Sequence, residues 1–386
     1  MGSTATAINL TNMINDYYLL IGLLLFSLTS SIALEMMALP RIIYIAKKKG
    51  LYDIPNGRKS HITPVPRLAG ITFLPILMLV FSICSLIIIK QSPIETVTIF
   101  GTALRKMVGF VAGSIVLAGI GIKDDLVGSR YSHKMLAQFI AACLLVSGGL
   151  YINDFNGLFG INEVPAWFGV PFTILLTVFI TNAMNLIDGA DGLASGIAGV
   201  ALISLGTMFF IRSMFFYSLI CVILVGILIP FFYYNVFNTN RKVFMGDTGS
   251  LSLGFLLAYL GIRFAMNIPS SYGTVDSPAL ISLSALFIPL FDALRVMIER
   301  AIKGKSMFMP DRRHLHHKLL DLGLSHRKVM INIVFWAQSL VIFNIMMVHI
   351  VNINLVFLFD IALWFGLIQL LNALKKKQKT RFALFF

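Results

Sequence analysis

Long apolar segments recur along the whole chain of 386 residues, and they restrict its possible folds more than any other feature. Hydrophobic residues make up 58% of the sequence and charged residues only 12%, about half the charged share of an ordinary soluble domain. Apolar runs of roughly 18 residues or more are long enough to cross the hydrocarbon core of a bilayer as helices. The sequence therefore predicts an all-α, polytopic membrane protein and excludes a soluble globular fold.

We expect about eleven transmembrane helices joined by short loops. The expected spans lie near residues 17–39, 68–89, 107–122, 133–152, 168–184, 193–211, 214–234, 249–266, 279–299, 329–349 and 354–372. The sequence contains no internal repeat and no inserted soluble segment, so residues 1–386 are expected to form a single integral membrane domain.

Basic residues predict the orientation of these helices. The formal net charge of +14 suggests nucleic acid in a soluble domain. Here, however, most of the 31 Lys and Arg residues gather in alternate loops, chiefly 41–67 and 300–328, and in the C-terminal tail. The positive-inside rule places such loops in the cytoplasm. We therefore expect the N-terminus outside, the C-terminus inside, contact with membrane lipid, and no nucleic-acid partner.

Five carboxylates are expected at the inner ends of the spans. They come from three loops: Asp124, Asp125, Asp188, Asp191 and Asp247. Like charges this crowded need a cation among them. Oxygen ligands favour Mg²⁺ or Mn²⁺, and the three cysteines, Cys84, Cys143 and Cys221, have no metal-binding or disulfide spacing. The sequence therefore predicts a site for a hard divalent ion at the inner face.

The alternative is a structural role for these acids. Asp191 and Asp247 are also suitable N-caps for the helices that follow them, and Asp124-Asp125 is compatible with a hydrated helix end. The glycines in 185–196 and 245–254 favour binding instead, because they let backbone N–H groups at helix N-termini approach a phosphate. Carboxylates, a divalent ion and helix N-termini together suit chemistry at a pyrophosphate bond. If the sixth helix has already begun at Asp188, then Asp188 and Asp191 share one of its faces.

Two inner loops carry basic side chains that are suited to binding anionic groups. Their candidate residues are Arg58, Lys59, His61 and Arg67 in the first loop, and Arg312, Arg313, His314, His316 and His317 in the second. The histidine spacing is poor for zinc, whereas imidazole and guanidinium groups bind phosphate by charge-assisted hydrogen bonds. The alternative is that the basic residues of the second loop bind no ligand, remain solvated and only set the orientation of the helices in the membrane.

In their order along the chain, these segments resemble the polyprenyl-phosphate N-acetylhexosamine-1-phosphate transferases, a bacterial membrane family. The resemblance runs from about Asp53 to His317, through Asp124-Asp125 with Lys134, 185–196, 245–254 and 310–317. It implies a single catalytic membrane domain in the bacterial cytoplasmic membrane, with its active site facing the cytoplasm. The implied reaction transfers a sugar 1-phosphate from a UDP-sugar to polyprenyl phosphate, releases UMP, requires Mg²⁺ and initiates a cell-surface glycan pathway.

The histidine-rich loop points to the donor. Its pattern, His314-Leu315-His316-His317, is similar to that of family members that use UDP-N-acetylglucosamine. The muramoyl-pentapeptide enzymes instead carry three consecutive histidines. The resemblance therefore favours UDP-N-acetylglucosamine and undecaprenyl phosphate as substrates, with phospho-N-acetylmuramoyl-pentapeptide transfer as the alternative. It leaves the oligomeric state open, a homodimer included.

The resemblance implies that Asp247 is the main Mg²⁺ ligand. We further expect Asp124 and Asp125 to complete the metal shell or position the lipid phosphate, and Asp188, Asp191 and Asn185 to bind the sugar nucleotide. The remaining candidates are expected to bind substrate or neutralise the leaving group, namely Lys134, Arg58, Lys59, His61, Arg67, Arg312, Arg313, His314, His316 and His317.

A transporter is the rival class, because acids within spans often mark ion paths. It predicts acids near the membrane midplane and repeat symmetry, whereas here most acids cluster at the inner face and the sequence contains no repeat. Asp292, Arg295 and Glu299 have the spacing of an ionic ladder along one helix, and they form either such a ladder or part of the site. Asp360, in the last span, has no partner that the sequence identifies.

Overall fold

The computed structural model describes residues 2–53, 64–91, 94–267, 275–304 and 313–383, with the side chains of 2–17, 53, 91–105 and 379–383 left out. Its elements are α1 Gly2–Lys49, β1 Tyr52–Asp53, β2 Val65–Pro66, the 3-10 helix η1 Ala69–Thr72, α2 Phe73–Gln91, α3 Ile94–Val127, α4 Tyr131–Ser147, the 3-10 helix η2 Leu158–Gly160, α5 Ala166–Ile187, α6 Leu193–Ile211, α7 Phe215–Phe232, the π-helix η3 Tyr233–Phe237, α8 Gly246–Ala265, α9 Pro278–Ala285, α10 Phe287–Ile302, α11 Leu315–Asp321, α12 His326–Met347 and α13 Ile353–Ala383.

The expected all-α membrane fold is confirmed. In the described part of the chain, nine helices are long and apolar enough to cross a membrane, and the bent pair α9 and α10 makes up to ten. The remaining expected span corresponds to α4, which has 17 residues. The expected span over 279–299 corresponds to a bent pair of helices, because α9 and α10 meet at 72°. Pro289 has no N–H with which to continue the helical hydrogen bonds across this break.

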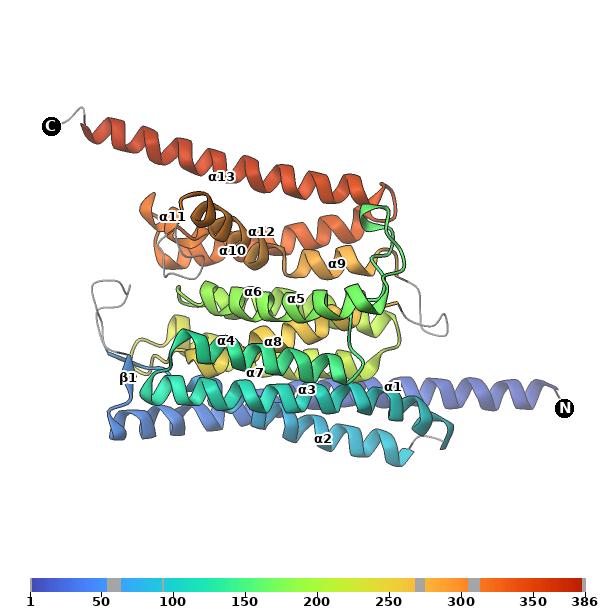
Figure 1. Cartoon of the computed structure of the whole chain (residues 1–386). Helices are drawn as coiled ribbons and strands as arrows, with labels where there is room; N and C mark the ends of the chain where they lie inside the picture. The colour runs from blue at the N-terminus through green and yellow to red at the C-terminus, as the bar shows by residue number, and fades with distance from the viewer. Residues whose placement is uncertain (1, 54–63, 92–93, 268–274, 305–312, 384–386) are drawn as a thin grey trace.

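α8 is the central helix of the bundle. Every residue from Thr248 to Ala265 is buried, and the helix packs against α3 and α5 (Figure 1). Phe110 of α3 stacks on both Phe255 and Tyr259 of α8, with ring centroids 6.1 and 4.3 Å apart. An element buried over its whole length holds its ends in fixed positions, so the residues at its N-terminus are well placed to organise a site.

The periphery of the bundle is apolar. Leu86, Leu175, Phe335 and Leu358, on four different helices, are all exposed. Such a surface is costly in water but matches the acyl chains of a bilayer. The described helices therefore form a multi-pass membrane protein, and their long axes lie roughly side by side (Figure 1).

Asp360 has a partner that the sequence did not identify. The side-chain amide nitrogen of Asn344 in α12 donates to Asp360 Oδ2 in α13 at 2.7 Å and to Ser284 Oγ in α9 at 2.6 Å. All three side chains are buried. This polar contact joins three helices in a region where water is scarce, so we assign Asp360 to the packing of the bundle.

The first inner loop is tied to the start of α8. Its end forms β2, which pairs with β1 in an antiparallel sheet. The N–H of Phe244 donates to the carbonyl of Pro66 at 2.8 Å, and the N–H of Gly70 donates to the carbonyl of Met245 at 2.9 Å. These hydrogen bonds hold the chain around Arg67 against the segment that carries Asp247.

Candidate active site

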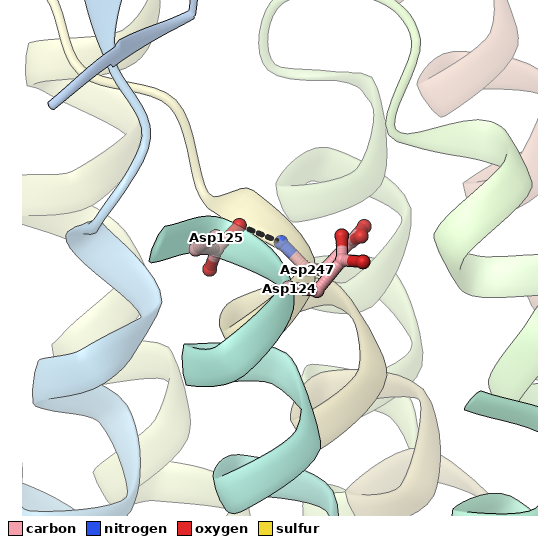
Figure 2. Close-up of side chains that lie close together, drawn as sticks. All are labelled: Asp124, Asp125 and Asp247. Atoms are coloured by element: carbon pink, nitrogen blue, oxygen red, sulfur yellow. Dashed lines mark hydrogen bonds between the residues drawn. The ribbon is translucent and has the colours of Figure 1, made fainter. Parts of the chain in front are cut away.

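Asp124, Asp125 and Asp247 lie together at one end of the bundle. Asp124 and Asp125 are in the last turn of α3, and Asp247 is in the first turn of α8 (Figure 2). One carboxylate oxygen from each lies within 4.8 Å of the others, and Asp124 and Asp125 are buried. This is the only group of three or more potential ligands of this kind among the described residues.

Asp125 uses both of its oxygens to bind the N-terminus of α8. Oδ1 accepts the N–H of Asp247 at 2.8 Å, and Oδ2 accepts the N–H and the hydroxyl of Thr248 at 3.0 and 2.6 Å. These N–H groups have no partner within the helix, so Asp125 caps α8 from a neighbouring helix. The side chains of Asp191 and Asp247 do not cap their own helices, whose N-cap residues are Gly192 and Met245.

Gly246 makes this close approach possible. Its φ is +73°, and a Cβ on it would lie 2.2 Å from the carbonyl oxygen of Arg67 and 2.6 Å from Asp125 Oδ2. Any other residue would be strained there and would collide with the capping carboxylate. The glycine before Asp247 is thus required by the contact between α3 and α8.

Lys134 supplies the cation that the crowded acids require. Its Nζ, from the first turn of α4, lies 2.8 Å from Asp124 Oδ2 and also forms an ion pair with Asp247 Oδ2. The other oxygen of Asp247 accepts a hydrogen bond from Asn185 Nδ2 at 2.8 Å, and Asn185 Nδ2 also contacts Ser250 Oγ at 2.8 Å. Asp247 therefore has one neutral partner from α5 and one charged partner from α4.

Arg67 stabilises the end of α3. Its guanidinium donates to the carbonyl oxygens of Asp124 and Asp125 at 3.4 Å, and its Nε lies 3.9 Å from Asp125 Oδ1. A cation is favourable at a helix C-terminus, so Arg67 has a structural role beside the one expected from the sequence. Arg58, Lys59, His61 and Arg312 lie outside the described residues.

Asp188 and Asp191 lie in a turn. The expectation that they share a helical face is wrong, because α5 ends at Ile187 and α6 begins only at Leu193. Gly192 in this turn has a φ of +73°, which a helix does not accommodate. Burial, followed by the nearby carboxylates of the site, raises the pKa of Asp188 well above its usual value. Asp191 pairs with Lys242 at 2.5 Å.

Asn235 joins the two glycine-rich segments, a role that was not expected from the sequence. Its Oδ1 accepts the N–H of Gly192 at 2.6 Å, and its Nδ2 donates to the carbonyl of Val243 at 2.9 Å. It lies in η3, a π-helix, a local geometry often found at functional sites. A polar residue at the end of an apolar span was the only available hint.

Asp292 anchors the histidine-rich loop. The sequence identified the loop but not this contact. Its Oδ2 contacts His314 Nδ1 at 2.9 Å, and both its oxygens accept the N–H of Leu315. Arg295 pairs with Asp292 and with Glu299, at 2.7 Å each, and donates to the carbonyl of Arg313 at 2.8 Å. The ionic ladder is therefore present, and it also fixes the start of α11.

The anchored loop reaches the Asp188 turn. His316 is buried, with neither ring nitrogen hydrogen bonded to any described residue, and a Cβ on Gly189 would lie 3.0 Å from its Nε2. Burial, and next the charge of neighbouring His317, lower the pKa of His316 to about 3. His316 is thus a neutral imidazole next to the acidic turn, while the ring of His317 lies 4.2 Å from it and is only half-buried.

Comparisons with known proteins agree with this arrangement. Residues 107–265 match the model of glycosyl transferase family 4. The chain is 33% identical over 351 residues to decaprenyl-phosphate N-acetylglucosaminephosphotransferase of Mycobacterium tuberculosis. The alignment covers 83% of this chain and 83% of the relative. The chain belongs to the polyprenyl-phosphate N-acetylhexosamine-1-phosphate transferase family. The family expected from the sequence is thereby confirmed.

Two further relatives belong to the same family. One is the probable undecaprenyl-phosphate N-acetylglucosaminyl 1-phosphate transferase of Bacillus subtilis, 30% identical over 77% of both chains. The other is the undecaprenyl-phosphate alpha-N-acetylglucosaminyl 1-phosphate transferase of Escherichia coli strain K12, 29% identical over 77% of this chain and 76% of the relative. The family's matched segment, 107–265, contains the whole carboxylate cluster and the Asp188 turn.

Proposed function

We propose that the protein transfers N-acetylglucosamine 1-phosphate from UDP-N-acetylglucosamine to undecaprenyl or another polyprenyl phosphate, at the cytoplasmic face of a bacterial inner membrane. The observation that carries this proposal is the carboxylate cluster of Asp124, Asp125 and Asp247 with Lys134 at the end of the membrane helices. The relatives are named as N-acetylglucosamine phosphotransferases that use decaprenyl or undecaprenyl phosphate.

The position of the cluster suits one water-soluble and one lipid substrate. A polyprenyl tail stays in the bilayer and a UDP-sugar stays in water, so the two meet only where helices end at the interface. Asp124 and Asp247 lie at such an end of α3 and α8. The basic loops gathered at this end favour the cytoplasmic side, in support of the proposed orientation.

The donor set suits Mg²⁺, with Mn²⁺ as a substitute. The ligands are hard carboxylate oxygens, and the protein already places a cation, the ammonium group of Lys134, between Asp124 and Asp247. Asp247 and Asp124 would hold the ion, with Asp125 beside them fixing the start of α8. When bound, Mg²⁺ supplies positive charge that offsets the charge of the pyrophosphate.

The transfer itself is a substitution at phosphorus. An oxygen of the lipid phosphate forms a bond to the phosphorus that carries the sugar, the bond from that phosphorus to the bridging oxygen breaks, and UMP leaves with the electron pair. A phosphate monoester is largely dianionic at pH 7 because its second pKa is near 6. Asp124 therefore positions the acceptor rather than removing a proton from it.

The other residues bind and neutralise the donor. Asp188 and Asp191, in the turn between α5 and α6, hold the sugar nucleotide together with Asn185. The imidazole of His317 and the guanidinium of Arg313 lie on the anchored loop that reaches this turn. Such groups stabilise charge that develops on leaving UMP, and Lys134 does the same from the side of the carboxylates.

Muramoyl-pentapeptide transfer is the second candidate. Leu315, which interrupts the histidines, is buried at the first position of α11, so the loop presents a different set of imidazoles from three consecutive histidines. This favours UDP-N-acetylglucosamine, and the two donors share every other step of the mechanism.

The test is UMP release by the purified protein in detergent with polyprenyl phosphate and Mg²⁺. UDP-N-acetylglucosamine, UDP-N-acetylgalactosamine and UDP-N-acetylmuramoyl-pentapeptide are offered separately, and Asp247→Ala is the control. We expect UMP only with UDP-N-acetylglucosamine, and none from the variant. UMP with the pentapeptide donor alone would assign the second candidate. No UMP with any donor from a folded sample would reject the proposed reaction and favour transport.

A further inference from the structure

Two arginines lie at the end of the bundle opposite the carboxylate cluster. Arg212 directly follows α6, and Arg263 is in the last turn of α8. Asp247 is in the first turn of α8, so about 24 Å of helix separates it from Arg263 at ~1.5 Å per residue. This is close to the thickness of the hydrocarbon core, so the arginine pair lies at the membrane interface remote from the proposed reaction.

Both side chains are nearly enclosed, each with only 7% of its surface exposed. The guanidinium of Arg212 lies 5.0 Å from the centre of the Phe264 ring, and its Nη1 donates to the Phe264 carbonyl at 3.0 Å. The guanidinium of Arg263 lies 5.0 Å from the centre of the Tyr217 ring. The Nε atoms of both are sealed from solvent and have no hydrogen-bond partner among the described residues. These contacts hold the two planar groups in place but leave most of their donors unused.

No carboxylate of the described residues lies within ion-pair distance of either arginine. Of the acids described at this end, Asp154 accepts the N–H of Asn156, Asp276 pairs with His349, and Glu163 is exposed and forms no ion pair with a described residue. The side chains of Asp16 and Glu95 lie outside those that the structure describes. Residues 268–274, which follow α8, contain no acid in their sequence. The two positive charges therefore have no neutralising partner among the described side chains.

Two buried like charges without a partner are unfavourable. Burial, and then the charge of Arg263, lower the pKa of Arg212 to about 10, so the Arg212 guanidinium remains protonated at neutral pH. The C-terminal ends of α6 and α8 each supply roughly half a negative charge, which offsets about one of the two positive charges. A net positive charge remains, at a membrane end where the positive-inside rule disfavours arginine.

We infer that Arg212 and Arg263 bind a phosphate group at the interface opposite the carboxylate cluster, and that it is the headgroup phosphate of an anionic phospholipid. A phosphate oxygen matches the planar fork of guanidinium donors. The buried, mutually packed rings of Phe209, Tyr217 and Phe264 hold the two guanidinium groups in place. The site is separate from the proposed transfer reaction and does not depend on it.

Native mass spectrometry of the delipidated protein in neutral detergent tests the inference. Phosphatidylglycerol is added in molar steps to the wild type, to Arg263→Gln and to Arg327→Gln. Arg263 donates no hydrogen bond to a described residue, so its replacement is expected to leave the fold intact. Arg327 is the matched control, because it lies 5.5 Å from the Phe237 ring at the other end of the bundle. We expect the tightest-bound lipid to be held at least tenfold more weakly by Arg263→Gln, and equally well by Arg327→Gln.

A parallel thermal-unfolding titration with inorganic phosphate separates lipid from free anion. We expect phosphatidylglycerol to raise the unfolding temperature of the wild type, and to do so at concentrations at which inorganic phosphate has no effect. Equal protection by inorganic phosphate would keep the phosphate site but reject the lipid as its occupant. Equal lipid affinity of the wild type and Arg263→Gln would overturn the inference. If Arg263→Gln fails to fold, Arg212→Gln replaces it under the same criteria.

Discussion

The carboxylate of Asp125, in the last turn of α3, accepts the backbone N–H of Asp247, in the first turn of α8, at 2.8 Å. The helix end that carries the central acid of the site is therefore capped by the neighbouring acid (Figure 2). α8 is buried from Thr248 to Ala265, so this hydrogen bond sets both the position of Asp247 and the packing of two central helices.

Replacing Asp125 is expected to affect stability as well as turnover. Asp125→Ala leaves two N–H groups and the hydroxyl of Thr248 without their acceptor, which costs roughly 1 to 2 kcal/mol of unfolding free energy. Asp125→Asn keeps one acceptor oxygen and is expected to lose less. Thermal unfolding in detergent measures both. A stability equal to that of the wild type in Asp125→Ala, with turnover lost, would assign Asp125 to the metal and not to the helix end.

Asp124→Asn separates positioning from base catalysis. If Asp124 only positions the lipid phosphate, the amide is expected to lower the rate of UMP release about 100-fold or more at every pH, since a misplaced acceptor is not corrected by alkali. If Asp124 removes a proton, the rate recovers as rising pH deprotonates the acceptor. The measurement is a pH–rate profile between pH 6 and 9, with the exposed Asp321→Asn as the control.

Lys134 is expected to compete with the divalent ion for the same carboxylates, because its ammonium group lies between Asp124 and Asp247. Lys134→Gln removes this positive charge, so we predict that Mn²⁺ binds roughly tenfold more tightly in the absence of substrate, given the repulsion of like charges at short range. Turnover is expected to fall. Electron paramagnetic resonance of Mn²⁺ measures the affinity, with Asp247→Ala as the variant that loses binding. Weaker binding by Lys134→Gln would mean that the lysine organises the site.

The spans and the crowding of acids at one end were predictable from the sequence because both depend on local pattern. Apolar runs mark helices wherever they occur, and an acid at the end of a run lies at the interface whatever packs beside it. The bend between α9 and α10 was not predictable in this way, because a straight helix and a bent pair of helices can have the same apolar sequence pattern. The turn at Asp188 was missed because its glycines also suit a helix N-terminus.

The roles of Asn235 and Asp292 depend on contacts between distant parts of the chain. Asn235 bonds to Gly192, 43 residues away, and Asp292 to His314, 22 residues away. A buried acid inside a span indicates only that some partner exists. The sequence therefore identified the ladder formed by Asp292, Arg295 and Glu299, but not the loop that it holds.

Asp292 gives a direct test of that anchor. Asp292→Ala leaves Arg295 and the N–H of Leu315 buried without their acceptor, and breaking a buried ion pair in this way costs roughly 3 to 5 kcal/mol. Glu299→Gln, at the more exposed end of the same ladder, is the matched control and is expected to cost less than about 1 kcal/mol. Chemical or thermal unfolding measures both. Equal, small losses would show that the loop does not depend on Asp292.

The buried His316 is expected to make the folded protein less stable in acid. Its pKa is lowered to about 3 in the folded protein, against about 6.5 for an unperturbed histidine, so the unfolded chain binds a proton first. The stability from this residue is therefore present above pH 6.5 and is lost progressively as the pH falls towards 3, at up to ~1.4 kcal/mol per pH unit. His316→Phe is expected to flatten the decline of the unfolding temperature between pH 6.5 and pH 4. His133→Gln, at an exposed position on α4, is expected to leave the decline unchanged, and an equally steep decline in His316→Phe would assign the acid sensitivity to another group.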